Sequence, residues 1–169
     1  MIGELEYTYA LADGTLPGII AVGAVYESSG EIEGVPVSAV DEYILQFEQW
    51  VLREDLSDEE ANQGLAIFAG YYPRFPGSQL SLESIGDSFV GGLTYTGLLP
   101  CRDEDVFGTG VAWTELFRGG TNEETVFEIF YKARITSHLA IQPDLQYIVT
   151  PSGIYRDALA VGLRFEVAL

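Results

Sequence analysis

Large apolar side chains alternate with small or charged ones, without interruption, along residues 158–169. The apolar positions are Leu159, Val161, Leu163, Phe165, Val167 and Leu169. Between them stand alanine, glycine, Arg164 and Glu166. Successive side chains of a β-strand point to opposite faces, so this segment predicts a strand with one apolar and one wet face. Strands that separate lipid from a water-filled lumen have this pattern.

The same alternation recurs along nearly the whole chain and predicts nine strands. Their expected ranges are 3–11, 17–27, 41–53, 63–73, 86–99, 106–117, 123–135, 138–149 and 156–168. Alternating segments of this length, separated by turns, are typical of transmembrane barrels. The second strand is apolar on both faces, so the pattern does not show which of its residues face outward. Pro143 lacks a backbone N–H, so a bulge or a sheet edge is expected there.

The connectors between the predicted strands differ in length and composition. The segments that carry Gly, Pro and Ser are 27–40, 73–86, 117–123 and 150–155, and two of them are long. The connectors 11–17 and 99–106 are short, and 135–138 is a bare turn. Long loops on one rim and tight turns on the other are the habit of outer-membrane barrels. The connector 53–62 is an exception, and we expect it to hold a short helical turn capped by Ser57.

Composition narrows the class of protein. The net charge of −18, from 26 acidic and 8 basic residues, argues against a nucleic-acid partner, because phosphate binding needs a basic surface. Nearly half of the residues are nevertheless apolar, with ten Tyr and nine Phe, which favours a sheet that faces lipid. No run of eighteen apolar residues exists, so a membrane-spanning helix is excluded. Cys101 is alone, so no disulfide or cysteine-based metal site is expected.

Several segments resemble one family. Residues 124–148, with Gln-Pro-Asp-Leu-Gln-Tyr at 142–147 as the most specific element, are similar to the C-terminal end of OprB-type carbohydrate-selective porins. The segments 97–105 (Gly-Leu-Leu-Pro-Cys-Arg-Asp-Glu-Asp) and 63–68 also resemble that family. The resemblance covers roughly residues 40–169. It implies a sixteen-stranded outer-membrane barrel, monomeric or trimeric, that passes sugars by facilitated diffusion. The family chain normally ends in an aromatic residue, whereas this one ends in Leu169.

Length and strand parity suggest a partial barrel. Sixteen strands need well over twice this chain, and single-chain bacterial barrels have an even number of strands. The first residues, Met-Ile-Gly-Glu-Leu-Glu-Tyr, have neither the basic region nor the apolar core of a signal peptide. We therefore expect residues 1–169 to form one all-β porin domain, an antiparallel up-and-down transmembrane barrel truncated at its N-terminus. The strands at 3–11 and 156–168 should leave two unpaired edges, unless they pair with each other.

The polar positions of the last three strands give the candidate sugar path. They are Glu128, Lys132, Arg134, Gln142, Asp144, Gln146, Arg164 and Glu166. Their donors and acceptors suit sugar hydroxyls, and Phe130 or Tyr72 offers a stacking face. Salt bridges that only stiffen the wall account for the same residues equally well, so both interpretations stay open.

Other candidate sites have simpler explanations. Ser137 and His138 are adjacent and would point to opposite faces of a strand, so a turn is favoured over a catalytic pair. Residues 102–105 lack the ligand spacing of a calcium loop, so a charged turn is expected. Outward aromatic residues near strand ends predict an interfacial girdle. They are Tyr71, Trp113, Tyr131 and Tyr147.

The sequence thus predicts a non-enzymatic, carbohydrate-selective porin of the bacterial outer membrane. Its partners would be sugars, outer-membrane lipid and, in a homotrimer, copies of itself, with no cofactor and no nucleic acid. The signal peptide would lie upstream of this sequence. The alternative is a small pore-less outer-membrane barrel with a structural or adhesion role, whose interior is filled by side chains.

Overall fold

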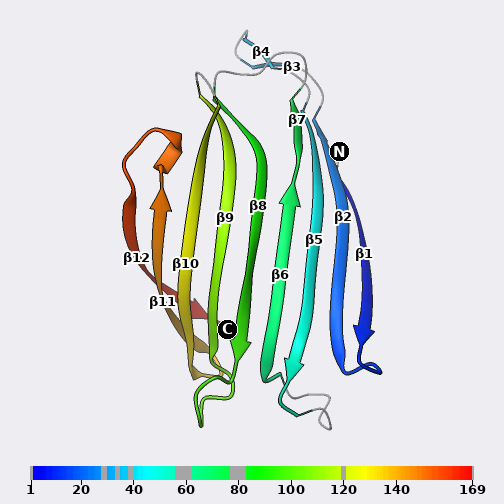
Figure 1. Cartoon of the computed structure of the whole chain (residues 1–169), viewed down its shortest axis with the longest axis vertical. Helices are drawn as coiled ribbons and strands as arrows, with labels where there is room; N and C mark the ends of the chain where they lie inside the picture. The colour runs from blue at the N-terminus through cyan, green and yellow to red at the C-terminus, as the bar shows by residue number, and fades with distance from the viewer. Residues whose placement is uncertain are drawn as a thin grey trace.

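The computed structural model describes residues 2–27, 30–32, 35–37, 40–55, 62–76, 83–118 and 121–168. Long antiparallel strands make up most of it (Figure 1). The main sheet contains β1 (Ile2–Leu11), β2 (Leu16–Glu27), β5 (Val40–Arg53), β6 (Gly64–Tyr72), β8 (Glu83–Thr96), β9 (Val106–Arg118), β10 (Thr121–Thr136), β11 (Leu139–Val149) and β12 (Ala158–Val167). Short elements complete the described fold: the β3 (Gly30–Ile32) and β4 (Val35–Val37) hairpin, β7 (Arg74–Pro76) paired with β5, and the 3-10 turn η1 (Pro151–Gly153).

The nine long strands lie in the order β1-β2-β5-β6-β8-β9-β10-β11-β12, so each pairs with the next long strand along the chain. Every pairing is antiparallel. The predicted all-β, up-and-down fold is confirmed, and the strand ranges agree within a few residues. Within the described ranges, no helix is long and apolar enough to cross a membrane.

Two local expectations differ from the structure, and a third lies outside the described residues. The connector expected at 117–123 is shorter, because β9 and β10 extend to Arg118 and Thr121. Pro143 creates neither a bulge nor an edge: it lies opposite Leu163 within an interior strand. Only the ladder to β10 is interrupted there, without a change of register, since a residue without an N–H removes a bond but need not insert a residue. The helical turn expected around Ser57 falls at 56–61, outside the described residues.

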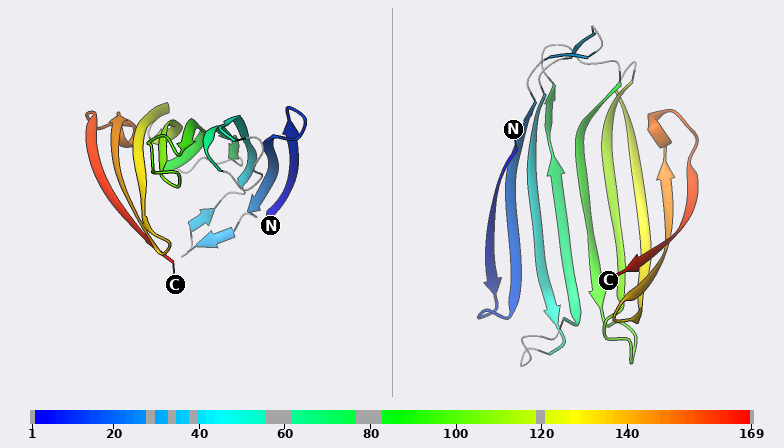
Figure 2. Two further views of the ribbon diagram at one scale, coloured as in Figure 1. Left: turned by 90° about the horizontal axis from the view of Figure 1, so that it is seen from below. Right: turned by 180° about the vertical axis from the view of Figure 1, so that it is seen from behind.

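The sheet is curled into an open half-pipe. Viewed along the strands, it forms an arch with β1 at one end and β12 at the other (Figure 2, left). These two strands pair with β2 and β11 respectively and not with each other. The expectation of two unpaired edges is therefore confirmed, and the described strands do not close into the small filled barrel.

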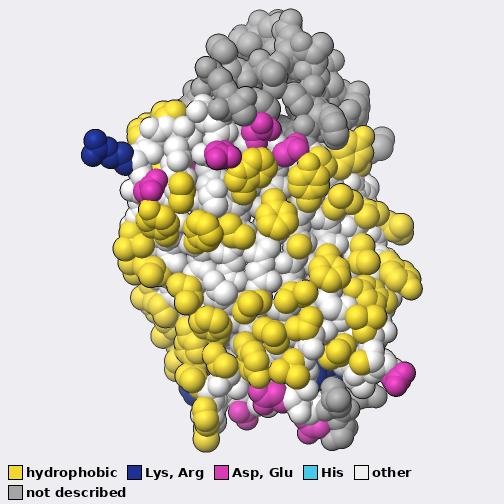
Figure 3. All heavy atoms as spheres, viewed as in Figure 1, with side chains coloured by type: hydrophobic (Ala, Val, Ile, Leu, Met, Phe, Trp, Pro, Cys, Tyr) yellow, Lys and Arg dark blue, Asp and Glu magenta, His cyan; other side chains and the backbone are white. Residues whose placement is uncertain are grey.

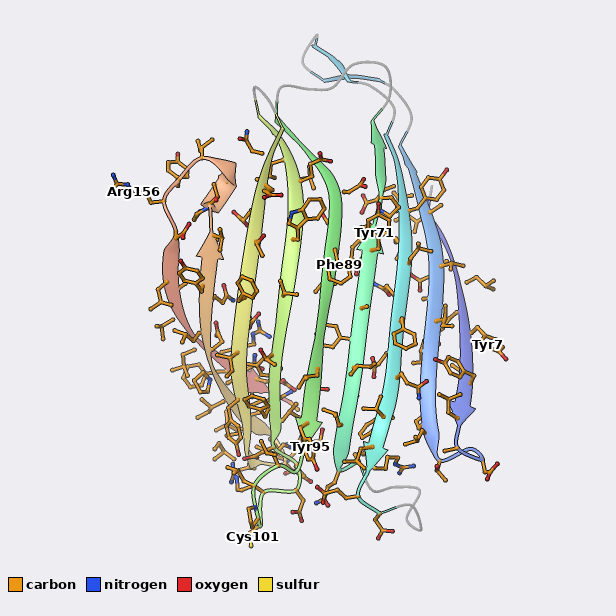
Figure 4. The ribbon with its side chains drawn as sticks, in the orientation of Figure 1. Tyr7, Tyr71, Phe89, Tyr95, Cys101 and Arg156 are labelled. Carbon is orange, nitrogen blue, oxygen red and sulfur yellow. The ribbon has the colours of Figure 1, made fainter. Side chains whose placement is uncertain are left out.

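The register assigns each side chain to one face of the arch. Tyr71 lies opposite Phe89, and both project from the convex side that faces the viewer in Figure 4. Followed across the sheet, the same face carries Leu159, Val161, Leu163 and Phe165, and the concave face carries Arg164 and Glu166. The predicted orientation of β12 is confirmed. The open phase of β2 is now assigned, because Ile20 and Val22 pair with the convex residues Phe47 and Leu45.

The convex face is broadly hydrophobic, with acidic side chains at its upper and lower margins (Figure 3). Its large apolar residues are exposed, reaching 69% at Leu5 and 79% at Val161. In contrast, the only buried hydrophobic residues in the described part are Ala21, Ala66 and Ala140. All three belong to the concave face by their register. A sheet with so little internal core needs an apolar medium outside it.

Curvature explains why the concave residues are small. On the inside of a bent sheet the Cβ positions converge, whereas on the outside they spread apart. At the centre of the arch Gly92 lies directly opposite Gly110. A Cβ at Gly92 would lie 2.4 Å from the carbonyl oxygen of Thr109, closer than real Cβ contacts. Glycine therefore allows β8 and β9 to approach closely where the sheet bends.

A charge on the convex face at mid-height should destabilise the fold in a membrane. We expect Leu145→Arg to cost about 2–4 kcal/mol, the usual range for a base facing lipid near the bilayer centre. Gln146→Arg places the same side chain one residue further on, on the concave face, and should cost much less. Urea unfolding in lipid vesicles, followed by tryptophan fluorescence, measures both. Equal losses for the two variants would contradict this assignment of faces.

Candidate functional site

The structure brings all eight predicted polar residues to one part of the concave wall. β10, β11 and β12 are neighbours, and Glu128 lies opposite Gln146 while Gln142 lies opposite Arg164. The Nζ of Lys132 lies 2.6 Å from Oε2 of Glu166, which joins β10 to β12 across β11. The wall therefore presents a connected polar surface, as the alternation predicted.

The three basic residues of this patch differ in how they are held. Lys132 is paired with Glu166, as described. Arg134 lies nearer the lower rim, where its Nε is 3.4 Å from Glu104 and its Nη2 donates to the carbonyl of Ser137. Arg164 forms no ion pair among the described residues and is exposed. The wall thus carries a paired ammonium on β10, a guanidinium without an ion pair on β12, and a second guanidinium on β10 at the lower rim.

Aromatic side chains lie along the concave wall rather than standing away from it. The ring of Phe130 occupies the space above Gly108, where an added Cβ would be 2.3 Å from two ring atoms. The ring of Tyr72 covers Gly70 in the same way, and its hydroxyl accepts a 3.0 Å hydrogen bond from Gln46. Both rings are half-buried. Each ring therefore packs over a glycine and remains partly exposed on the concave wall.

The other half of the wall carries candidate residues that the sequence analysis did not select. An open hollow of about 380 Å³ lies over β1, β2, β5, β6 and β8. Its lining includes Glu4, Glu6, Gln46, Glu48, Phe68 and Tyr72. No base lines it. The alternation of Glu4 and Glu6 with apolar neighbours was visible in the sequence, but only the register shows that they share a face with Phe68.

Two rows of aromatic residues cross the convex face near its ends. The upper row is Tyr71, Phe89 and Trp113, and the lower row is Tyr95, Phe107 and Tyr131. Six residues of β8 separate the rows, or about 20 Å along a strand. Figure 4 shows Tyr71 and Phe89 well above Tyr95.

The tyrosine hydroxyls and the tryptophan N–H near the rims donate hydrogen bonds to Asp and Glu carboxylates. In the upper row Tyr71 donates to Asp87 at 2.6 Å and Trp113 donates to Glu123 at 3.0 Å. Tyr147, also near the upper rim, donates to Asp157 at 2.7 Å. In the lower row Tyr95 donates to Glu54 at 2.6 Å. Apolar rings with hydrogen-bonded tips suit the boundary between lipid and water, so their positions agree with the predicted girdle.

The lower-rim turn at 97–105 is organised around Asp105, which is 2% exposed. Its carboxylate accepts hydrogen bonds from the Tyr131 hydroxyl, from the Arg134 backbone N–H and from Arg102 Nε, the last at 2.6 Å. Burial alone would raise the pKa of Asp105, but these three donors together lower it. The turn therefore ties β8 and β9 to β10.

The simpler explanations of the remaining candidates agree with the structure. Residues 102–105 form a charged turn, and Ser137 and His138 form the tight turn between β10 and β11. Within the described ranges, no group of three or more His, Cys, Asp or Glu residues is placed to hold a metal ion. At the upper rim the Tyr147 hydroxyl and the Thr150 N–H lower the pKa of Asp157.

Replacing Asp105 with Asn should destabilise the protein and flatten its acid sensitivity. Loss of charge-assisted bonds at a buried group typically costs about 1–3 kcal/mol. Because the folded pKa of Asp105 is lowered, its contribution is present above the unfolded carboxyl pKa and is lost as pH falls through the folded pKa. Urea unfolding between pH 7 and pH 2 should show this loss in the unmodified protein and not in Asp105→Asn. The exposed neighbour change Asp103→Asn is the control, and an identical pH profile for both variants would refute the role of Asp105.

Comparisons with known proteins agree with this architecture. Residues 38–169 match the family described as carbohydrate-selective porin, OprB family. A high-pH structure of Pseudomonas putida OprB superimposes with a TM-score of 0.78 at 21% identity, covering 98% of this chain and 47% of that chain. A low-pH structure of the same protein gives a TM-score of 0.60 at 19% identity, covering 97% of this chain and 54% of that chain. The chain thus spans about half the length of these structures. Among curated proteins, no significant sequence match is found.

Proposed function

Because this chain belongs to the OprB family of carbohydrate-selective porins, we propose that it forms part of the wall of an outer-membrane pore through which sugars diffuse. The observation that carries the proposal is the division of one sheet into an uncharged apolar convex band and a polar concave wall. Selectivity in such a pore comes from its width and from the groups that line it. Diffusion needs no catalytic group or cofactor, and we assign none.

The surrounding partners follow from the same division. The convex band would contact outer-membrane lipid between the two aromatic rows. The rim with the longer connectors would face the exterior and the rim with the tight turns the periplasm, as in other outer-membrane barrels. The homotrimer implied by the family resemblance remains a prediction.

We further propose that additional antiparallel strands of the same polypeptide close the arch, so that residues 1–169 are the C-terminal portion of one porin domain. Two observations support this proposal. Both edge strands have an unpaired side, and exposed edges of ten residues each invite pairing. The P. putida OprB chain is about twice as long as the part that this chain covers.

A liposome-swelling assay tests the function and the closure together. The 169-residue chain and a full-length parent with the additional strands are reconstituted separately and exposed to small neutral sugars. We expect rapid swelling with the parent and little with the 169-residue chain, because an open arch does not enclose a lumen. Equal rates for both would show that the shorter chain is already a complete pore. No sugar uptake by either would overturn the sugar-porin proposal itself.

We place the sugar path along Glu128, Lys132, Arg134, Gln142, Asp144, Gln146, Arg164 and Glu166, together with the rings of Phe130 and Tyr72. Charged and amide groups side by side on adjacent strands can donate to and accept from several hydroxyls at once. The free guanidinium of Arg164 and the carboxylate of Glu128 are available donors and acceptors within this surface.

Two variants distinguish a sugar contact from a stiffening salt bridge. Lys132→Gln removes the ammonium donor, whereas Glu166→Gln breaks the same 2.6 Å ion pair but leaves Lys132 free. We expect Lys132→Gln to raise the half-saturating sugar concentration about 2- to 10-fold, as for one lost hydrogen bond. Glu166→Gln should not raise it, because the glutamine amide can still donate to and accept from a sugar hydroxyl. Both side chains are partly exposed, so either variant should change the free energy of unfolding by about 1 kcal/mol or less.

If the ion pair only stiffens the wall, the two variants should instead lose similar stability and leave sugar saturation unchanged. That result would remove Lys132 from the proposed path.

A further inference from the structure

The centre of the concave wall combines an aromatic ring with two positions that have no side chain. Phe68 on β6 lies opposite Glu48 on β5 and opposite Gly92 on β8. Gly92 in turn lies opposite Gly110 on β9, and Gly110 lies opposite Glu128 on β10. One row across five strands therefore reads carboxylate, ring, glycine, glycine, carboxylate.

The ring of Phe68 leans into the space left by these glycines. Its Cζ would be 2.7 Å from a Cβ at Gly92 and 3.6 Å from a Cβ at Gly110. The ring therefore extends from β6 across β8 toward β9, along the wall. Any side chain larger than hydrogen at Gly92 would have to displace it.

Phe130 does the same from the opposite direction. It starts on β10 and covers Gly108 on β9, where three of its ring atoms would lie within 3.1 Å of an added Cβ. Phe68 and Phe130 thus converge over β8 and β9 from the two flanking strands. Together with Glu128 they line one hollow of about 100 Å³ on the concave face.

Packing alone does not account for this arrangement. Rings that serve only as core are buried, whereas Phe68 and Phe130 remain half-buried, with glycine beneath them. A ring fixed against the wall keeps its outer face available without narrowing the lumen. The face of an aromatic ring carries a partial negative charge that attracts the weakly positive C–H groups on the face of a pyranose.

We propose that Phe68 and Phe130, packed over the side-chain-free positions Gly92, Gly110 and Gly108, form a stacking platform for a pyranose ring. The carboxylate of Glu128, at the edge of the platform, accepts a hydrogen bond from a sugar hydroxyl. The three glycines are positioning residues. This inference rests on the proposed sugar-porin function and names two specificity-determining rings within it.

The test uses the protein in whichever form passes sugars in the swelling assay, with glucose as the probe. Phe68→Leu and Phe130→Leu keep apolar volume but remove the ring face. We expect each to raise the half-saturating glucose concentration about 3- to 10-fold, the effect of losing one aromatic contact. Ion conductance without sugar should stay near that of the unmodified protein, because leucine extends no further into the lumen than phenylalanine does. Phe68→Tyr should retain the unmodified saturation.

A glycine variant tests the positioning role. Gly108→Ala would meet only the side chain of Phe130 among its three nearest contacts, so it should tilt that ring into the lumen without a backbone clash. We expect it to weaken glucose saturation and also to lower ion conductance. In a Phe130→Leu background, which removes the ring, the same glycine change should have little further effect on glucose saturation.

A matched control lies on the convex face of β8, the strand that carries Gly92 on its concave face. Phe89 packs on Gly91 on the convex side, with its Cζ 3.0 Å from an added Cβ. Phe89→Leu should leave glucose saturation unchanged. Heat-modified gel migration confirms that each variant folds, and the two leucine variants on separate strands provide independent tests. Unchanged saturation in the folded leucine variants would overturn the platform and leave the porin function standing, whereas an unmodified protein without sugar uptake would overturn both.

Discussion

The structure depends on a single curled sheet, and in the described part of the chain no second protein layer covers either of its faces. A soluble sheet buries one face against helices or another sheet, and most of its stability comes from that contact. Here the described residues bury only three alanines among their hydrophobic side chains, and none of them is large. The apolar layer must therefore be the surroundings. Backbone hydrogen bonds between strands, which lipid cannot replace, hold the sheet itself together.

Curvature distributes residue sizes between the two faces. The convex side spreads its Cβ atoms apart and carries Leu, Ile, Val and aromatic residues, while the concave side brings them together and carries many alanines and glycines. Small neighbours leave space for some of the polar groups on the concave side. Asp144, for example, occupies the space over Gly162, where an added Cβ would overlap its carboxylate. The bend of the sheet and the chemistry of its inner wall are thus set by the same residues.

Much of this arrangement could be predicted from the sequence because a strand has a period of two. The alternation in β12 predicted which of its residues face outward, and the same signal located the other eight long strands. The prediction failed where the alternation is weak, or where the outcome depends on a strand distant in the sequence. Residues 19–25 are apolar on both faces, so only pairing with β5 gave β2 its phase. At Pro143 the missing N–H interrupts the ladder to β10 and not the ladder to β12, and the sequence does not show which of the two strands it faces.

Only the part of the candidate site that comes from consecutive strands could be predicted from the sequence. Polar residues on β10, β11 and β12 are close in sequence, so their grouping was visible. Glu4, Glu48 and Phe68 come from strands far from these, and only the register across the sheet places them on the same wall. The packing of Phe68 and Phe130 over glycines was not predicted either. The direction in which each ring points depends on glycine positions in the neighbouring strands, which the sequence does not place beside it.

The strict sequence of neighbours in the sheet also bears on how the chain acquires its structure. Each long strand pairs with the long strand before it, so every ladder closes over one connector. The entropy lost in closing a loop grows with its length, and short closures are fast. The sheet can therefore grow hairpin by hairpin, each new strand using the last as its template. Contact order therefore stays low for an all-β protein.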